Sequence, residues 1–142
     1  MPVTQINNVE AVAKLKDLAT WLYESAEMKQ EKNLIKCVDV DRYKKTLPLL
    51  KALGYDQIPL KSSQGHGYHI YRTSGETEII KRPDLKTLFF PLSVGSGNNS
   101  IASGEVQVAG ETVAPGSFIH LDSTLTITAQ LDCLIVYLPE GK

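Results

Sequence analysis

The sequence predicts an α+β fold that is mainly β, with N-terminal helices packed on a C-terminal β-barrel. Apolar side chains in residues 9–26 recur with a period near 3.6, which is typical of an amphipathic helix. From Gly65 onward, glycines and prolines separate short runs rich in Ile, Val, Thr, Tyr and Phe, as in a β-sandwich or barrel. Since no low-complexity linker divides the 142 residues, we expect one domain, with a helical part over 1–60 and the barrel over 61–142.

The N-terminal part is predicted to hold two helices. The first covers residues 9–26, and Asn7 can cap its first turn. The segment LIKCVDV that follows can be a strand or another helical turn. A second, short helix is expected to begin near Thr46, because Pro48 lacks the N–H donor and clashes with the preceding turn when it lies deep in a helix. Gly54 is expected to end it in the left-handed conformation.

The C-terminal part is predicted to consist of short strands. Turn residues bound each strand, and β-branched and aromatic residues fill them. The expected strands lie near residues 67–73, 76–82, 86–94, 100–108, 111–114, 117–121, 124–130 and 132–138.

The composition argues against several classes of protein. With 42 % hydrophobic and 22 % charged residues, the chain is globular in character, and its net charge of −1 gives no reason to expect nucleic acid or a membrane surface as partner. Lys44, Lys45 and Lys51 are interpreted as a solvated face. The start MPVTQINNVE has no signal-peptide pattern, so the cytoplasm is the expected location. Cys37 and Cys133 are too few for a disulfide scaffold or a four-ligand zinc site, and we expect both to be reduced and structural.

The stretch IASGEVQVAGETVAPGSFIHLDSTLTITAQLDCLIVYLPEG, from Ile101 to Gly141, resembles the cupin superfamily of small jelly-roll barrels. In this resemblance IASGEV closes the first cupin motif, PGSFIHLDST opens the second, and DCLIVYLPEG is the closing strand. Gly104, Gly110 and Gly116 each fall where the chain must turn between strands. The resemblance implies a cupin-like double-stranded β-helix, or jelly roll, for the C-terminal part.

The metal ligands of that family are missing from the aligned positions. The family uses two histidines and a glutamate in the first motif and a third histidine in the second. Here the aligned positions, none of which offers a lone pair for a metal, are Phe90, Leu92, Gly97 and Ile127. We therefore expect no metal and no cofactor. The alternative is a non-standard metal site made by His66, His69, His120 and Glu76. These residues are suitable ligand types, but their spacing in the sequence is not diagnostic of a metal site.

His69 and Tyr71 are the central pair of the predicted site. Residues two apart on a strand share a face, so these two point one way while Tyr68, Ile70 and Arg72 point the other. The resemblance to metal-free cupin epimerases and isomerases implies an acid–base pair, since histidine titrates near neutrality and tyrosine can donate a proton. The alternative is an exposed strand, of the kind that can form a dimer, whose polar and aromatic residues only tolerate a half-buried surface.

His120 has two interpretations that the pattern leaves open. It shares a face with Phe118, whereas Ile119 and Leu121 occupy the other face, so both faces of this strand are apolar. If His120 faces the interior, it can meet His69 or a ligand; if not, it is a packed histidine bonded to a carbonyl.

We expect a ligand pocket to be lined from GHGYHIYR and from the strand that holds His120. Phe90, Phe118 and Ile127 are expected to form its apolar wall. The polar groups expected there, besides the candidate catalytic residues His69, Tyr71 and His120, are those of His66 and Arg72. Arg72 offers a planar fork to a carboxylate or phosphate, and a solvent-facing strand charge is its alternative role.

Three functions remain open on the sequence alone, because fold does not determine function. The first is a metal-independent, cupin-like protein that binds a small polar or anionic molecule, as a homodimer joined through edge strands. The second is a metal-independent isomerase, epimerase or lyase that uses His69, Tyr71 and His120. The third is a structural or interaction module whose helical part docks on a partner. The polar residues of GHGYHIYR favour the first.

Overall fold

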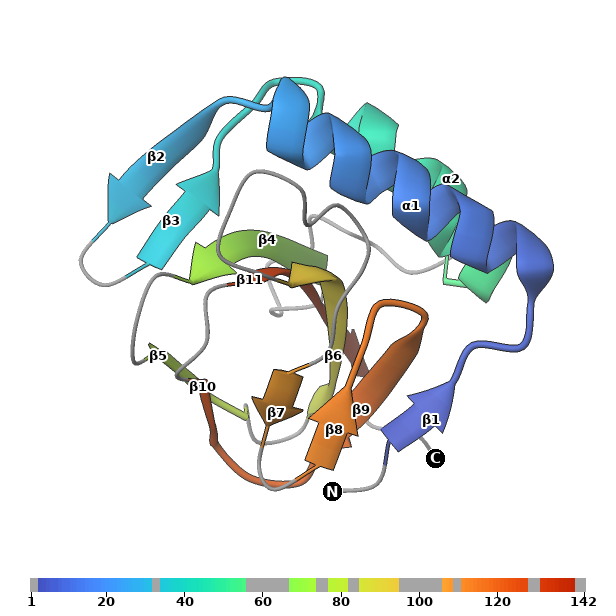
Figure 1. Cartoon of the computed structure of the whole chain (residues 1–142), viewed down its shortest axis with the longest axis vertical. Coiled ribbons are helices and arrows are strands. Elements are labelled where there is room, and N and C mark those ends of the chain that lie inside the picture. The colour runs from blue at the N-terminus through green and yellow to red at the C-terminus, as the bar shows by residue number, and fades with distance from the viewer. Residues whose placement is uncertain are drawn as a thin grey trace.

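In the computed structural model, the described residues form two helices on one side of a large β-sheet and two small sheets on the other (Figure 1). Within the described residues the helices are α1 (Val9–Glu24) and α2 (Arg42–Leu53). The structure describes residues 3–31, 34–55, 67–73, 77–81, 85–94, 106–108, 111–127 and 131–139. The mainly β, α+β fold class predicted from the sequence is confirmed.

Of the described strands, seven form one antiparallel sheet, in the order β1-β9-β6-β11-β4-β3-β2. Their bounds are β1 (Val3–Gln5), β2 (Met28–Glu31), β3 (Leu34–Cys37), β4 (Gly67–Thr73), β6 (Leu85–Val94), β9 (Ser117–Leu121) and β11 (Leu131–Pro139). Because β1 and β2 stand at its two edges, the described sheet is open, and the predicted jelly-roll barrel is not confirmed. The sheet does not end at β4, because β3 pairs with the side of β4 that faces away from β11. The β2–β3 hairpin therefore extends the sheet at this end.

Four short strands form two further sheets within the described part of the chain. One pairs β5 (Thr77–Ile79) with β10 (Leu125–Ile127), and the other pairs β7 (Val106–Val108) with β8 (Glu111–Val113). Both pairs are antiparallel. In Figure 1 they lie on the side of the large sheet away from the helices.

The large sheet is buried on both faces, as its central strand β11 shows. Leu134 and Val136 belong to the core under the helices, and Cys133 and Ile135 belong to the core that includes β5 and β10. Successive side chains of a strand point to opposite faces, so β11 serves both cores with alternate residues. We call these two surfaces of the large sheet the helix face and the inner face.

Helix α1 lies on the helix face with the apolar stripe that its periodicity predicts. Its cap is Asn8 and not the predicted Asn7, because from position 8 the Oδ1 atom reaches the amides of the second and third helical residues. This oxygen accepts from Glu10 at 2.9 Å and from Ala11 at 3.2 Å. The Nδ2 atom of Asn8 donates to the carbonyl of Ala52 at 2.9 Å, which joins the start of α1 to the end of α2. The buried side chains of the stripe are Ala11, Leu15, Leu18, Ala19 and Leu22.

Helix α2 begins at Arg42, ahead of the predicted start near Thr46, and holds Pro48 in its interior. The prediction was wrong because packing outweighs the effect of the proline. An interior proline costs about 3 kcal/mol, whereas burial of Leu49 and Leu50, both 0 % exposed, gains about 2 to 3 kcal/mol each. Gly54 ends α2 as predicted, with a φ of 86° in the left-handed region that glycine adopts without strain.

Candidate ligand-binding site

An aromatic cluster lies on the inner face of the large sheet. The rings of His69 and Tyr71, both on β4, lie 5.5 Å apart and nearly parallel, at 12°. The ring of Tyr137 on β11 approaches His69 edge-on, with centroids 5.5 Å apart. Antiparallel pairing of β4 with β11 brings the two strands together, and Tyr71 and Tyr137 both pack on the inner core. The imidazole of His69 is therefore held by tyrosine rings from two neighbouring strands.

A cavity of about 270 Å³ opens beside this cluster. Two tyrosines of the cluster, Tyr71 and Tyr137, form part of its wall, and the carboxylate-bearing Glu78 of β5 forms another part. The full lining is Leu34, Tyr71, Glu78, Ile79, Ile80 and Tyr137. Apolar walls with a few polar groups are typical of small-molecule sites.

Sequence reasoning did not identify Tyr137 and Glu78 as parts of this cavity. Tyr137 follows Cys133 and Ile135 at two-residue spacing, so its place on the inner face was readable from the strand DCLIVYLP. Its contact with His69 depends on the β4–β11 register, in which Tyr137 pairs with Gly67 and Ile135 pairs with His69. Glu78 lies on a separate small sheet, and no local sequence signal brings it beside Tyr71.

Arg72 lies on the opposite face from His69 and Tyr71 and makes an ion pair there. Its Nε atom donates to Asp132 Oδ1 at 2.7 Å, and its Nη2 atom donates to Asp132 Oδ2 at 3.1 Å. The same Nη2 atom lies 3.5 Å from the carbonyl oxygen of Leu22 in α1. The hydrogen bond to Asp132 raises the pKa of Arg72 above its ordinary value. The guanidinium thus connects β4, β11 and the last turn of α1, and it does not line the cavity beside Tyr71.

Three more predicted site residues, on β6 and β9, also lie on the helix face: Phe90, Phe118 and His120. Phe118 packs on the helix-side core and stacks on Phe90, with ring centroids 5.0 Å apart at 27°. His120 shares this side of β9 with Phe118, since Ile119 between them belongs to the inner core. The side chain of His120 is exposed. The structure therefore does not bring His120 together with His69, which lies on the inner face.

The remaining predicted site residues fall in different places. Ile127 is 0 % exposed on β10 and packs in the inner core, on the same side of the large sheet as the aromatic cluster. His66, Glu76 and Gly97 lie outside the described residues. Among the residues that the structure describes, no group of three or more His, Cys, Asp or Glu side chains is arranged to hold a metal ion.

The two cysteines are buried and unbridged. Cys37 belongs to the helix-side core and Cys133 to the inner core, so the large sheet separates them. Burial raises the pKa of both thiols, which keeps them protonated at neutral pH. Neither has the environment of a reactive thiol, which needs a lowered pKa and access to solvent.

Two further observations bear on the class of protein. Neither α1 nor α2, the helices in the described ranges, combines the length and apolar character needed to cross a membrane. Comparison with protein-family models, with curated proteins and with solved structures found no match to this chain. The class that the described residues define is an α+β domain with an open antiparallel sheet and a small cavity on its inner face.

Proposed function

We propose that this chain is a metal-independent binding protein for a small polar molecule, and that the ligand binds in the cavity on the inner face of the large sheet. One observation carries the proposal: His69 is held by two tyrosine rings, and both of these tyrosines line the cavity. Side chains fixed by packing before the ligand arrives lower the entropic cost of binding.

The lining favours a ligand with hydroxyl or ammonium donors over an anionic one. Glu78 supplies a carboxylate to the cavity wall, and carboxylates accept hydrogen bonds and repel anions. Arg72, the group that the sequence suggested for an anion, is paired with Asp132 on the helix face. Of the predicted site residues that the structure describes, Tyr71 lines the cavity and His69 packs against the two tyrosines of its wall. The predicted residues that do not line it are Arg72, Phe90, Phe118, His120 and Ile127.

The second candidate function is a metal-independent isomerase, epimerase or lyase at the same place. The near-parallel stack of His69 on Tyr71 favours it, because this stack sets an imidazole beside a phenol. One member of such a pair can remove a proton from a substrate carbon, and the other can return a proton to the opposite side of that carbon. The two candidates share a site and differ in whether the bound molecule is converted.

The cupin resemblance supports this location of the site. We infer that the large sheet and the β5–β10 sheet are the two facing layers of an open, cupin-like jelly roll, since ligands of small barrels occupy the space between their layers. Residues of both layers line the cavity: Tyr71 and Tyr137 from the large sheet, and Glu78 and Ile79 from β5. An experimental structure in which the β5–β10 sheet does not face the large sheet would overturn this inference.

We also propose that the chain forms a homodimer through an edge strand. β2 is an edge of the large sheet, and an edge strand presents backbone N–H and C=O groups to another strand. Sedimentation should give the mass of two chains, and Gln30→Pro, which removes one N–H donor from β2, should shift the mass toward one chain. A monomeric wild-type protein would exclude this proposal.

A screen of small molecules followed by thermal unfolding tests the binding proposal. Sugars, amino acids and small amines are the compounds to screen, and a true ligand raises the melting temperature further with each increase of its concentration above Kd. Tyr71→Phe and Glu78→Gln should each remove most of that rise. His120→Asn is the matched control, because it changes an exposed histidine on the opposite face, and it should leave the rise intact.

The same variants show whether the ligand binds in this cavity, and a further variant separates a binding protein from an enzyme. A rise that persists in Tyr71→Phe and Glu78→Gln would place the ligand elsewhere and overturn the proposal. Once a ligand is known, NMR spectra of that compound incubated with the protein show whether it is converted into a product. Conversion that stops in His69→Asn while binding persists would support the enzyme, and no conversion supports the binding protein.

A further inference from the structure

A groove follows the seam between α1 and α2 on the side away from the sheet. Two cavities, of about 460 Å³ and about 260 Å³, share the lining residues Lys14, Lys44 and Pro48 and therefore lie side by side along this seam. On α1 the lining runs from Glu10 to Trp21, which corresponds to about 16 Å along a helix. The groove is thus elongated, and it lies on the other side of the molecule from the cavity beside Tyr71.

The groove combines an apolar lining with a positively charged rim. Leu47, Pro48 and Ala52 supply apolar surface, and Tyr43 adds an aromatic ring that is 42 % exposed. The charged residues that line the two cavities are four lysines and two acids: Lys14, Lys44, Lys45, Lys51, Glu10 and Asp17. Since the whole chain has a net charge of −1, this excess of positive charge is local to the groove.

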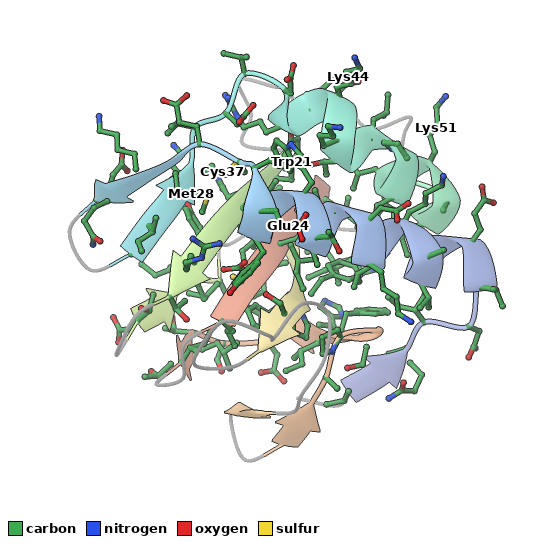
Figure 2. The ribbon with its side chains drawn as sticks, turned by 45° about the horizontal axis from the view of Figure 1, so that its top comes forward. Trp21, Glu24, Met28, Cys37, Lys44 and Lys51 are labelled. Atoms are coloured by element: carbon green, nitrogen blue, oxygen red, sulfur yellow. The ribbon has the colours of Figure 1, made fainter. Side chains whose placement is uncertain are left out.

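The sequence positions of α2 explain why the lysines gather. Lys44, Pro48 and Lys51 are four and three residues apart, so they lie on one face of the helix. Figure 2 shows Lys44 and Lys51 projecting outward from α2. Pro48 adds apolar ring surface between the two lysines on this face.

We propose that the α1–α2 groove binds an acidic, amphipathic peptide segment of a partner protein. An amphipathic helix places apolar residues at i, i+3 or i+4, and i+7 into such a groove. Its carboxylates would face the lysine rim, and its apolar residues would cover Leu47, Pro48 and Ala52. The elongated shape favours a peptide over a compact molecule, and the proposal stands independently of the ligand site on the inner face.

A synthetic peptide tests this on the full-length protein. The probe is an acidic peptide without tryptophan, with leucines at helical spacing and glutamates between them. Trp21 is the only tryptophan of the chain and lines the groove, so its emission reports occupancy directly. We expect a saturable change in emission that weakens with added salt, because exposed charge pairs are screened.

Matched double variants separate the groove from overall charge. Lys44→Glu with Lys51→Glu should weaken binding by about tenfold or more, since two favourable charge contacts become unfavourable. Lys16→Glu with Lys29→Glu changes the net charge equally but alters exposed lysines that do not line the groove, and it should change the affinity less than about twofold. Thermal unfolding of each variant verifies that the fold is intact.

Other outcomes would overturn the proposal. One is an unchanged Trp21 emission at saturating peptide; another is equal weakening by the two double variants. A peptide with lysine in place of glutamate that binds equally well would exclude charge recognition. Vesicles of anionic lipid that bind through Lys44 and Lys51, with no response to the peptide, would assign the groove to a membrane surface.

Discussion

The ion pair between Arg72 and Asp132 offers a quantitative test of how the large sheet is held together. The two side chains share two hydrogen bonds, and the side chain of Asp132 is 4 % exposed while that of Arg72 is 23 % exposed. Asp132→Asn keeps the shape of the side chain and removes its charge. Arg72→Met keeps an extended apolar side chain and leaves the buried carboxylate without its partner.

The expected losses follow from this burial. Removal of one partner from a fully buried pair costs about 3 to 5 kcal/mol, whereas an exposed pair is worth less than about 1 kcal/mol. Because Arg72 keeps some contact with water, Asp132→Asn should lower the free energy of unfolding by about 2 kcal/mol. Arg72→Met should lower it by about 3 kcal/mol. The double variant with Arg72→Met and Asp132→Leu should lose less than the sum, since it leaves no unpaired charge.

Equilibrium unfolding in urea at neutral pH measures these free energies. Emission of Trp21, which packs on the helix-side core, follows the transition. Losses below about 0.5 kcal/mol in both single variants would show that the pair is solvated and contributes little. A double variant that loses the full sum would show that the two residues act independently.

Three other changes test separate features of the fold. Pro48→Ala restores an amide donor on an exposed part of α2 and should raise the free energy of unfolding by about 1 to 2 kcal/mol; a lower urea midpoint would contradict this. Gly54→Ala should cost about 1 kcal/mol from its φ of 86° alone, since among the described residues no atom beyond the chain neighbours lies within 4 Å of an added Cβ, and an unchanged midpoint would refute the strain. Burial raises the pKa of the Cys133 thiol above its usual 9.0, so the folded protein holds a proton that the unfolded chain releases. Stability should therefore fall as the pH rises past about 9, by at most about 1.4 kcal/mol per pH unit for this thiol. The fall should be shallower in Cys133→Ala, and an identical fall would exclude Cys133 as a cause.

The sequence predicted best the elements whose local signals agree with their packing. Strands β4 (67–73) and β9 (117–121) begin and end where glycine spacing and alternation placed them. The alternation also placed His69 and Tyr71 on the face opposite to Arg72. The structure confirms this placement, because Tyr71 packs on the inner core and its neighbour Ile70 belongs to the core under the helices. These predictions succeeded because side-chain direction along a strand is a local property.

The elements that were missed depend on pairing with other strands, which no local apolar pattern announces. β1 and β2 are short, and β2 (MKQE) is mostly exposed, so neither carries an apolar alternation; each forms by pairing with a strand that supplies its hydrogen bonds. The Arg72–Asp132 pair spans 60 residues and requires the β4–β11 register. The pattern of β9 gave two apolar faces without saying which one meets the helices, and for this reason it could not place His120 relative to His69.

NMR signals of the histidine rings, followed as ligand is added, show most directly whether the ligand binds on the inner face of the large sheet. The chain has only three histidines, so the ring signals of His69 and His120 can be assigned by substituting each in turn. With a small polar ligand found by the thermal screen, we expect the ring signals of His69 to shift until the ligand saturates the site. Those of His120, exposed on the opposite face, should stay unchanged. A ligand that shifts His120 and leaves His69 unaffected would contradict a binding site on the inner face.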